Sequence, residues 1–116
     1  MKPDVFDLFA VAASTEEELF QTLLTGRGPF RLERIVSCGQ SSAKDFWYDQ
    51  EDDEWVALLS GRATLLFLQD DGSTETVSLR SGQALFIPAH CRHRLLFTST
   101  TPPCLWLALH GTLENQ

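Results

Sequence analysis

Short apolar runs separated by turn residues fill the chain from Pro29 onward, and they constrain the fold more than any other feature. The runs are FRLERIVS, EWVALLS, ATLLFLQ, ETVSLR, ALFIP, HRLLFTS and CLWLALH, and stretches such as DDGST, SGQ and TTPP separate them. Strand-like runs spaced roughly eight to twelve residues apart are typical of a β-sandwich or barrel. No helical block lies between the runs, which argues against βαβ units. The pattern predicts an all-β fold of about seven or eight strands.

One short helix is predicted ahead of these strands. Ser14 and Glu17 have the spacing of a capping box, in which each side chain accepts a hydrogen bond from the backbone of the other. Apolar residues follow at helical spacing, and Gly26 and Gly28 would end the helix. The apolar residues of this stripe are Leu19, Phe20, Leu23 and Leu24. The preceding segment, DVFDLF, alternates loosely and predicts either a short strand or an extended arm.

Length and charge limit the organisation and the partners. A chain of 116 residues has room for one domain. We expect an N-terminal extended segment and helix over residues 1–28 and a barrel over residues 29–112. The net charge of −7 disfavours nucleic acids and anionic membranes as partners.

Cysteine usage and the N-terminus bear on the compartment. Cys38, Cys91 and Cys104 are irregularly spaced and lack a CxxC pair, which favours reduced thiols. Acidic residues interrupt the first ten positions, so no signal peptide is indicated, and the apolar runs are too short to span a bilayer. We therefore expect a cytoplasmic protein.

Several of the runs are apolar at every position. In WVALL, ATLLFL and LWLAL the alternation expected for a strand with one buried face is missing, so both faces are apolar. The inner face can fill a barrel, but the outer face needs a cover of its own. The N-terminal segment could cover part of it. For the rest we expect a homodimer that buries Trp or Leu side chains from these strands.

Two spacings around the acidic segment FWYDQEDDEWVALLSG and the later segment GQALFIPAHCRH define a pattern. Six residues separate Glu54 from Gly61, five separate Gly82 from Pro88, and His93 is the fifth residue after Pro88. This pattern resembles the two motifs of the cupin superfamily, here as a small single-domain cupin with a degenerate first motif. The resemblance implies a double-stranded β-helix, or jelly-roll barrel, which the short N-terminal helix would precede.

The chain departs from the motifs at the positions that bind metal in this superfamily. The two histidines of the first motif fall on Tyr48 and Gln50, and the glycine after the proline of the second motif falls on His90. Glu54 and His93 remain. The resemblance therefore implies a divalent metal, such as Fe, Mn, Ni, Co or Zn, held by Glu54, His93 and Gln50. Mixed nitrogen and oxygen ligands suit these metals. Tyr48, with Asp49 and His90, would line the ligand pocket.

Each of these residues also has an ordinary structural interpretation. Glu54 could pair with Arg92 or Arg94, and His93 could be a core histidine satisfied by hydrogen bonds. Tyr48 and Gln50 could line a pocket that holds no metal. The run of acids from residue 51 to 53 is typical of a solvated surface, and its members Glu51 and Asp53 are expected to face solvent. For His110 the default interpretation is an ordinary residue at a strand end, although it could cap the barrel interior.

Two functions remain open at this stage. The first is a metal-dependent enzyme that acts on a small organic molecule within the barrel. The second is a non-catalytic small-molecule-binding or structural protein that has lost its metal. A nucleophile elbow and a Gly-rich phosphate loop are both missing from the sequence, so neither serine-hydrolase nor phosphate-loop chemistry is indicated.

Overall fold

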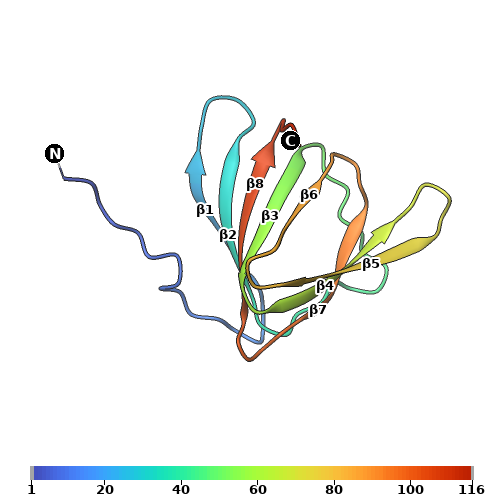
Figure 1. Ribbon diagram of the computed structural model, residues 1–116, viewed down its shortest axis with the longest axis horizontal. Helices are drawn as coiled ribbons and strands as arrows, with labels where there is room; N and C mark the ends of the chain where they lie inside the picture. Colours follow the sequence, from blue (N-terminus) through green and yellow to red (C-terminus); the bar gives the residue numbers. More distant parts are fainter. Residues whose placement is uncertain (1, 116) are drawn as a thin grey trace.

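The computed structural model describes residues 2–115, which form two antiparallel sheets facing each other (Figure 1). The larger sheet has five strands in the order β1-β2-β8-β3-β6, and the smaller has three in the order β5-β4-β7. The strands are β1 (Leu19–Thr25), β2 (Arg31–Ser37), β3 (Asp53–Ser60), β4 (Arg62–Leu68), β5 (Thr74–Arg80), β6 (Ala84–Ile87), β7 (His93–Thr98) and β8 (Cys104–Gly111). The predicted all-β jelly-roll fold is confirmed, and β2 to β8 coincide with the seven apolar runs.

The core lies between the two sheets and follows from side-chain alternation along each strand. On β3, Glu54, Val56 and Leu58 point inward and are buried, whereas Trp55 points outward. The smaller sheet contributes inward residues of β4, and β8 adds Trp106, which is 4% exposed. The buried cluster comprises Val56, Leu58, Ala63, Leu65, Phe67, Leu79, Ile87, Cys104, Trp106 and Ala108. This apolar layer fills the barrel below the polar groups described in the next section.

The long loop between β2 and β3 closes one side of the barrel. It runs alongside β7 in space, and the N–H of Ser42 donates to the carbonyl of Leu95 at 2.8 Å. Further along, Tyr48 forms an isolated antiparallel bridge with His93, with the N–H of Tyr48 donating to the carbonyl of His93 at 2.8 Å. β7 belongs to the smaller sheet, and the loop joins two strands of the larger one. The bridge therefore connects the two sheets through the loop and fixes Tyr48 beside His93.

The predicted N-terminal helix is wrong. Within the described residues the helix is replaced by β1, which pairs antiparallel with β2 through a register that shifts between Thr22 and Leu24. Ser14 Oγ accepts the N–H of Glu16 at 3.1 Å, which is a local turn rather than a capping box. An isolated helix of this length is marginal, whereas the free edge of β2 offers a ladder of hydrogen bonds. Sheet pairing therefore outweighs the helical spacing of the apolar residues.

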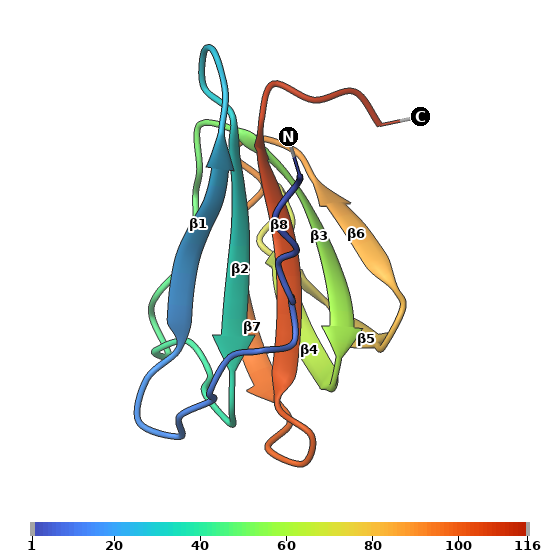
Figure 2. The ribbon, with the colours of Figure 1, turned by 90° about the vertical axis from the view of Figure 1, so that its left-hand side faces the viewer.

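The residues before β1 form an extended arm, one of the two alternatives expected for DVFDLF. The arm projects from the outer face of the larger sheet (Figures 1 and 2). Its base is attached at Arg34, whose Nη1 donates to the carbonyl oxygen of Leu8 at 3.2 Å. The division at residues 28 and 29 stays a prediction. Within the described part of the chain, no helix is long and apolar enough to cross a membrane.

Candidate functional site

A cavity of about 200 Å³ opens into the barrel between the two sheets. Apolar side chains from both sheets form its floor, and a small group of ionisable residues lies among them. The lining consists of Glu18, Phe20, Arg31, Glu33, Ile35, Tyr48, Gln50, Glu54, Val56, Leu65, Ile87, His93, Leu95, Trp106 and His110. An apolar cavity with a few converging polar groups is the usual form of a small-molecule site.

Glu54 and His93 meet inside this cavity. Glu54 comes from β3 in the larger sheet and His93 from the first position of β7 in the smaller sheet. His93 Nε2 lies 4.0 Å from Glu54 Oε1, and the two residues are 6% and 7% exposed. Within residues 2–115, Glu54 forms no ion pair with Arg92 or Arg94. Arg94 instead donates to the carbonyl of Ala43 at 2.9 Å.

His110 and Glu33 complete the ionisable group. His110 is on β8 and pairs in register with Glu54, and its Nε2 lies 3.8 Å from Glu54 Oε2. The same nitrogen lies 3.2 Å from Oε1 of Glu33, which is on β2. The Glu54 carboxyl is therefore flanked by two imidazoles, one at each oxygen. We refer to Glu33, Glu54, His93 and His110 as the cavity cluster.

Neighbouring groups fix the ring of His93. Its Nδ1 lies 2.9 Å from the carbonyl oxygen of Cys91, and because a carbonyl can only accept, Nδ1 carries the hydrogen. In the neutral ring Nε2 is then an acceptor, and it faces Glu54. Tyr48 stacks on one side of the ring with centroids 5.3 Å apart, and Phe67 stacks on it at 5.7 Å. This arrangement suits a neutral imidazole whose unprotonated Nε2 faces the Glu54 carboxyl at 4.0 Å.

Burial favours the uncharged form of each member of the cluster that shows a shift. It raises the pKa of Glu54 from 4.5 to about 7, with a further contribution from the nearby charge of Glu33 and an opposing one from Arg31. Burial also lowers the pKa of His93. The pKa of His110 is lowered by burial and by Arg31, against the opposing charge of Glu33. Near neutral pH the cavity therefore holds neutral imidazoles and a carboxyl group poised between its two protonation states.

Tyr48 and Gln50 both line the cavity. Burial raises the pKa of Tyr48, followed by the charge of Glu18, so its hydroxyl remains a neutral donor. Asp49 and His90 are not part of the lining. They contact each other at the surface, with His90 Nδ1 2.7 Å from Asp49 Oδ1. His90 has a φ of 61° in the turn before β7.

The acidic residues 51–54 differ in where their side chains lie. Glu54 is buried in the cavity and Glu51 is exposed. Asp53, which was expected to face solvent, is half-buried instead. Its carboxylate accepts the N–H of Ala89 at 2.8 Å and that of Leu113 at 3.0 Å. These two hydrogen bonds lower the pKa of Asp53. Asp53 therefore connects β3 to the turn after β6 and to the C-terminal tail.

The donor groups of the predicted metal site, Glu54, His93 and Gln50, all line the cavity. Among residues 2–115, no group of three or more His, Cys, Asp and Glu side chains is arranged to hold a metal ion. The cavity cluster offers suitable donor types, with the Nε2 atoms of His93 and His110 lying 4.0 and 3.8 Å from the Glu54 oxygens. Metal ligation by Glu54, His93 and Gln50 therefore stays a prediction.

The sequence analysis missed Glu33, and its default interpretation of His110 was an ordinary strand-end residue, whereas both line the cavity. Both have a weak signal in the sequence. Glu33 lies between Arg31 and Ile35 at alternating positions of β2, so a charged residue occupies the inward face of a strand. His110 follows Trp106 and Ala108 with the same alternation on β8. Only the pairing register of β2, β8 and β3 brings these side chains to Glu54.

Comparisons with known proteins agree with this fold. No protein-family model matches the chain, and neither does any curated protein. A crystal structure from Ralstonia eutropha, described as a "putative mannose-6-phosphate isomerase", is 42% identical, with a TM-score of 0.84, and the match covers 96% of this chain and 100% of that one. A cupin superfamily protein from Desulfitobacterium hafniense is 15% identical over 97% of this chain and 94% of its own, with a TM-score of 0.74. The cupin domain of Cnp3 from Schizosaccharomyces pombe is 11% identical over 94% and 69%, with a TM-score of 0.73.

Proposed function

Because this chain belongs to the cupin superfamily, we propose that its barrel binds a small organic molecule in the cavity and that Glu54 is the group that exchanges a proton with it. The observation that supports this proposal is the position of the Glu54 carboxyl between two imidazoles. Its oxygens lie 4.0 Å from His93 Nε2 and 3.8 Å from His110 Nε2. A buried acid with a pKa of about 7 can donate or accept a proton near neutral pH.

The size and charge of the cavity narrow the ligand class. Its volume of about 200 Å³ is below the roughly 300–1,000 Å³ of sites for drug-sized molecules, which favours a compact metabolite. Three carboxyl-bearing residues line it, namely Glu18, Glu33 and Glu54, against the single guanidinium of Arg31. This balance favours a neutral or cationic polar molecule and disfavours a phosphate ester.

The Ralstonia protein's description names a sugar phosphate, so the charge argument can be tested directly. We expect mannose 6-phosphate to bind this cavity less well than mannose, because its dianion would face the carboxyl groups. Isothermal titration with both sugars measures the difference. Tighter binding of the phosphate ester would overturn the ligand class while leaving a cavity-binding function intact.

The general experiment is a thermal-shift screen in metal-free buffer with neutral and cationic polyols, sugars, amides and amines. A ligand of the cavity should raise the melting temperature of the wild type and have a much smaller effect on Glu54→Gln. The matched control is Glu75→Gln, which makes the same change at an exposed position of β5 and should respond like the wild type. If every stabilising compound acts equally on wild type and Glu54→Gln, Glu54 has no role in binding.

A second candidate function is binding of a divalent metal. The observation in its favour is that Nε2 atoms of two histidines face the two oxygens of one carboxyl group. The cluster would have to draw together around an ion, with Gln50 supplying an amide oxygen. Glu54 must lose its proton for this, so we expect affinity to rise as the pH increases through about 7. Reconstitution with Fe, Mn, Ni, Co or Zn followed by elemental analysis tests the idea, and a metal content far below one per chain would defeat it.

A further inference from the structure

Glu18 is the one carboxylate of the cavity lining that has no basic side chain beside it within residues 2–115. Glu33 has Arg31 Nε at 3.9 Å from its Oε2, and the Glu54 carboxyl lies between two imidazoles. The Oε2 of Glu18 instead accepts a hydrogen bond from the neutral hydroxyl of Ser37 at 2.5 Å. Glu18 is half-buried, so water screens its charge less than that of an exposed carboxylate. The cavity therefore contains one acidic group that can attract a further cation.

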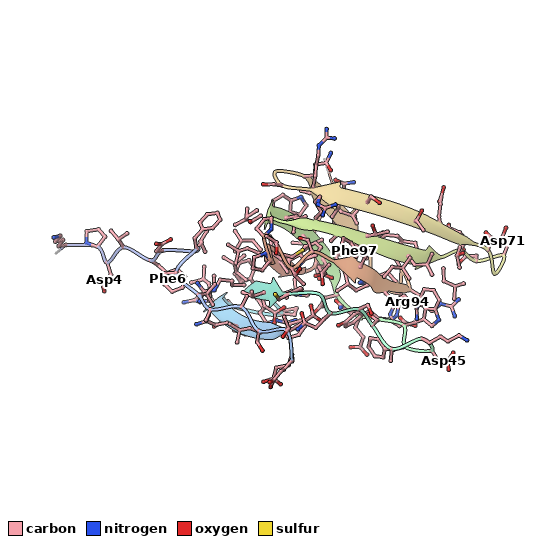
Figure 3. All side chains as sticks on the ribbon, turned by 90° about the horizontal axis from the view of Figure 1, so that it is seen from below. Asp4, Phe6, Asp45, Asp71, Arg94 and Phe97 are labelled. Carbon is pink, nitrogen blue, oxygen red and sulfur yellow. The ribbon has the colours of Figure 1, made fainter. Side chains whose placement is uncertain are left out.

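The arginines next to the cavity walls do not supply that cation. Arg34 and Arg94 each lie between two cavity-lining residues of their strand, so they point out of the cavity. Arg34 donates to a backbone carbonyl of the N-terminal arm at 3.2 Å. Arg94 lies beside the loop that carries Asp45 (Figure 3) and donates to a backbone carbonyl of that loop at 2.9 Å. In the part of the chain that the structure describes, Arg31 is the only arginine or lysine of the lining, so a cation that pairs with Glu18 would come from a ligand.

An indole ring lies next to the Glu18 carboxylate. Trp106 Nε1 donates to Ser37 Oγ at 3.1 Å, and the same hydroxyl donates to Glu18. A single hydroxyl group therefore connects the carboxylate and the indole, and both side chains line the cavity. Indole is the aromatic group that attracts cations most strongly, and it does so most effectively where water is excluded. Trp106 is only 4% exposed.

Two further aromatic residues belong to the same part of the cavity. Phe20 follows Glu18 by two positions, so the two side chains lie on the same face of the chain, and both line the cavity. Burial raises the pKa of Tyr48, and the charge of Glu18 is the next largest cause, so the carboxylate acts on this phenol. We refer to Glu18, Phe20, Tyr48 and Trp106 as the cation subsite. A carboxylate among aromatic rings is the combination that recognises organic ammonium groups.

We infer that the cation subsite binds the ammonium group of a compact amine, an inference that rests on the cavity binding proposed above. The strand register orients such a ligand. Trp106 and His110 are four residues apart on β8, and His110 pairs with Glu54, so about 13 Å of backbone separates the subsite from the level of Glu54. The ammonium group therefore lies at one end of the cavity, and the group that exchanges a proton with Glu54 lies at the other.

The experiment compares pairs of compounds that differ only by an ammonium group in place of a hydroxyl group. The pairs are ethanolamine and ethylene glycol, cyclohexylamine and cyclohexanol, and glucosamine and glucose. Isothermal titration of the wild type measures each dissociation constant. We expect the amine of at least one pair to bind about tenfold or more tightly than its neutral partner, because only the amine gains the contacts with the carboxylate and the rings.

Glu18→Gln tests which residue produces this preference. The amide oxygen of Gln can still accept the hydrogen bond from Ser37, so the variant removes the charge and retains the buried contact. The amine should lose about tenfold in affinity, and its neutral partner should bind as it does to the wild type. The matched control is Glu17→Gln, which makes the same change at the preceding, exposed position and should retain the preference for the amine.

The outcomes separate this inference from the proposed function. Neutral compounds that bind as tightly as their amines in every pair would overturn the cation subsite and leave binding in the cavity intact. An amine preference that persists in Glu18→Gln, or that Glu17→Gln reduces equally, would also overturn it. If no amine binds, the inference fails, and binding of the neutral compounds then decides whether the proposed function survives.

Discussion

Glu54 Oε1 and His93 Nε2 lie 4.0 Å apart although the two residues belong to different sheets and are separated by the chain from β3 to β7. The contact exists only because the barrel closes, and the bridge between Tyr48 and His93 holds that closure in place. A titratable pair in such a position links the charge state of the cavity to the stability of the fold.

The first prediction concerns the pH dependence of that stability. The pKa of Glu54 is raised from 4.5 to about 7 in the folded chain, so the folded state binds the proton more tightly than the unfolded state does. The resulting stabilisation is complete below pH 4.5 and is lost as the pH rises through 7, by about 3 kcal/mol. Glu54→Gln cannot ionise, so its stability relative to the wild type should improve by that amount over this range.

Urea unfolding of both proteins at about pH 4 and pH 8 measures this difference. The histidines act in the opposite sense, because their lowered pKa values make the folded state lose stability as the pH falls below 6.5. Subtracting the free energy of unfolding of the wild type from that of the variant at each pH removes the contribution of the histidines, which both proteins share. Glu75→Gln controls for the loss of a carboxylate in general. A difference between Glu54→Gln and wild type that stays constant from acid to base would contradict the raised pKa.

Glu54 and His93 could be identified from the sequence because their spacings resemble the two cupin motifs. Glu54 precedes Gly61 and His93 follows Pro88 at intervals that a barrel brings together, and the structure places both in the cavity. Glu33 could not be assigned in that way, and the default interpretation of His110 was an ordinary strand-end residue. Their approach to Glu54 depends on which strand pairs with which and in what register, and β2, β8 and β3 are neighbours in space but not in sequence.

The N-terminal segment shows the limit of local patterns. Leu19, Phe20 and Leu24 satisfy helical spacing, but that spacing says nothing about a free strand edge nearby. In the structure Phe20 pairs with Ile35 and lines the cavity, whereas Leu24 pairs with Leu32 on the outer face. Because the register shifts between Thr22 and Leu24, Phe20 and Leu24 point to opposite faces of the sheet although they are four residues apart. Pairing with β2, which a local stretch of sequence does not reveal, determines that this segment is a strand and not a helix.

The second prediction concerns a buried polar contact in the wall of the cavity, between Trp106, Ser37 and Glu18. Trp106 Nε1 donates to Ser37 Oγ at 3.1 Å, and Ser37 Oγ donates to Glu18 Oε2 at 2.5 Å. Ser37 is fully buried and Trp106 is 4% exposed, so Ser37→Ala leaves the indole N–H without an acceptor. We expect a loss of about 1–3 kcal/mol in the free energy of unfolding.

Ser78→Ala is the control for this substitution. The Ser78 hydroxyl also has a side-chain partner, Thr64 at 3.1 Å, but it is exposed on β5, where water can replace the lost bond. Its effect should stay within about 0.5 kcal/mol. Equal losses in the two variants, measured by urea unfolding, would show that burial of the indole N–H is not the cause.

The third prediction compares two turn glycines with the same backbone conformation. Gly61 and Gly82 both have a φ of 93°, in the left-handed region that L side chains rarely adopt. A Cβ at Gly82 would meet nothing within 4 Å, whereas one at Gly61 would lie 2.8 Å from both Cys104 Cα and the carbonyl oxygen of Pro103. Gly82→Ala should therefore cost only the backbone strain, about 1–2 kcal/mol. Gly61→Ala should cost more, by at least about 1 kcal/mol, because backbone atoms of β8 and the residue before it must move.

Urea unfolding of the two alanine variants measures the difference directly, and each serves as the control for the other. The comparison isolates the steric contact because the conformational strain is shared. It also tests the placement of β8, since the close approach at Gly61 occurs only if Cys104 packs under the turn between β3 and β4. If Gly82→Ala proved as costly as Gly61→Ala, that close approach would carry no energetic weight, and the tight turn would be required for its backbone conformation alone.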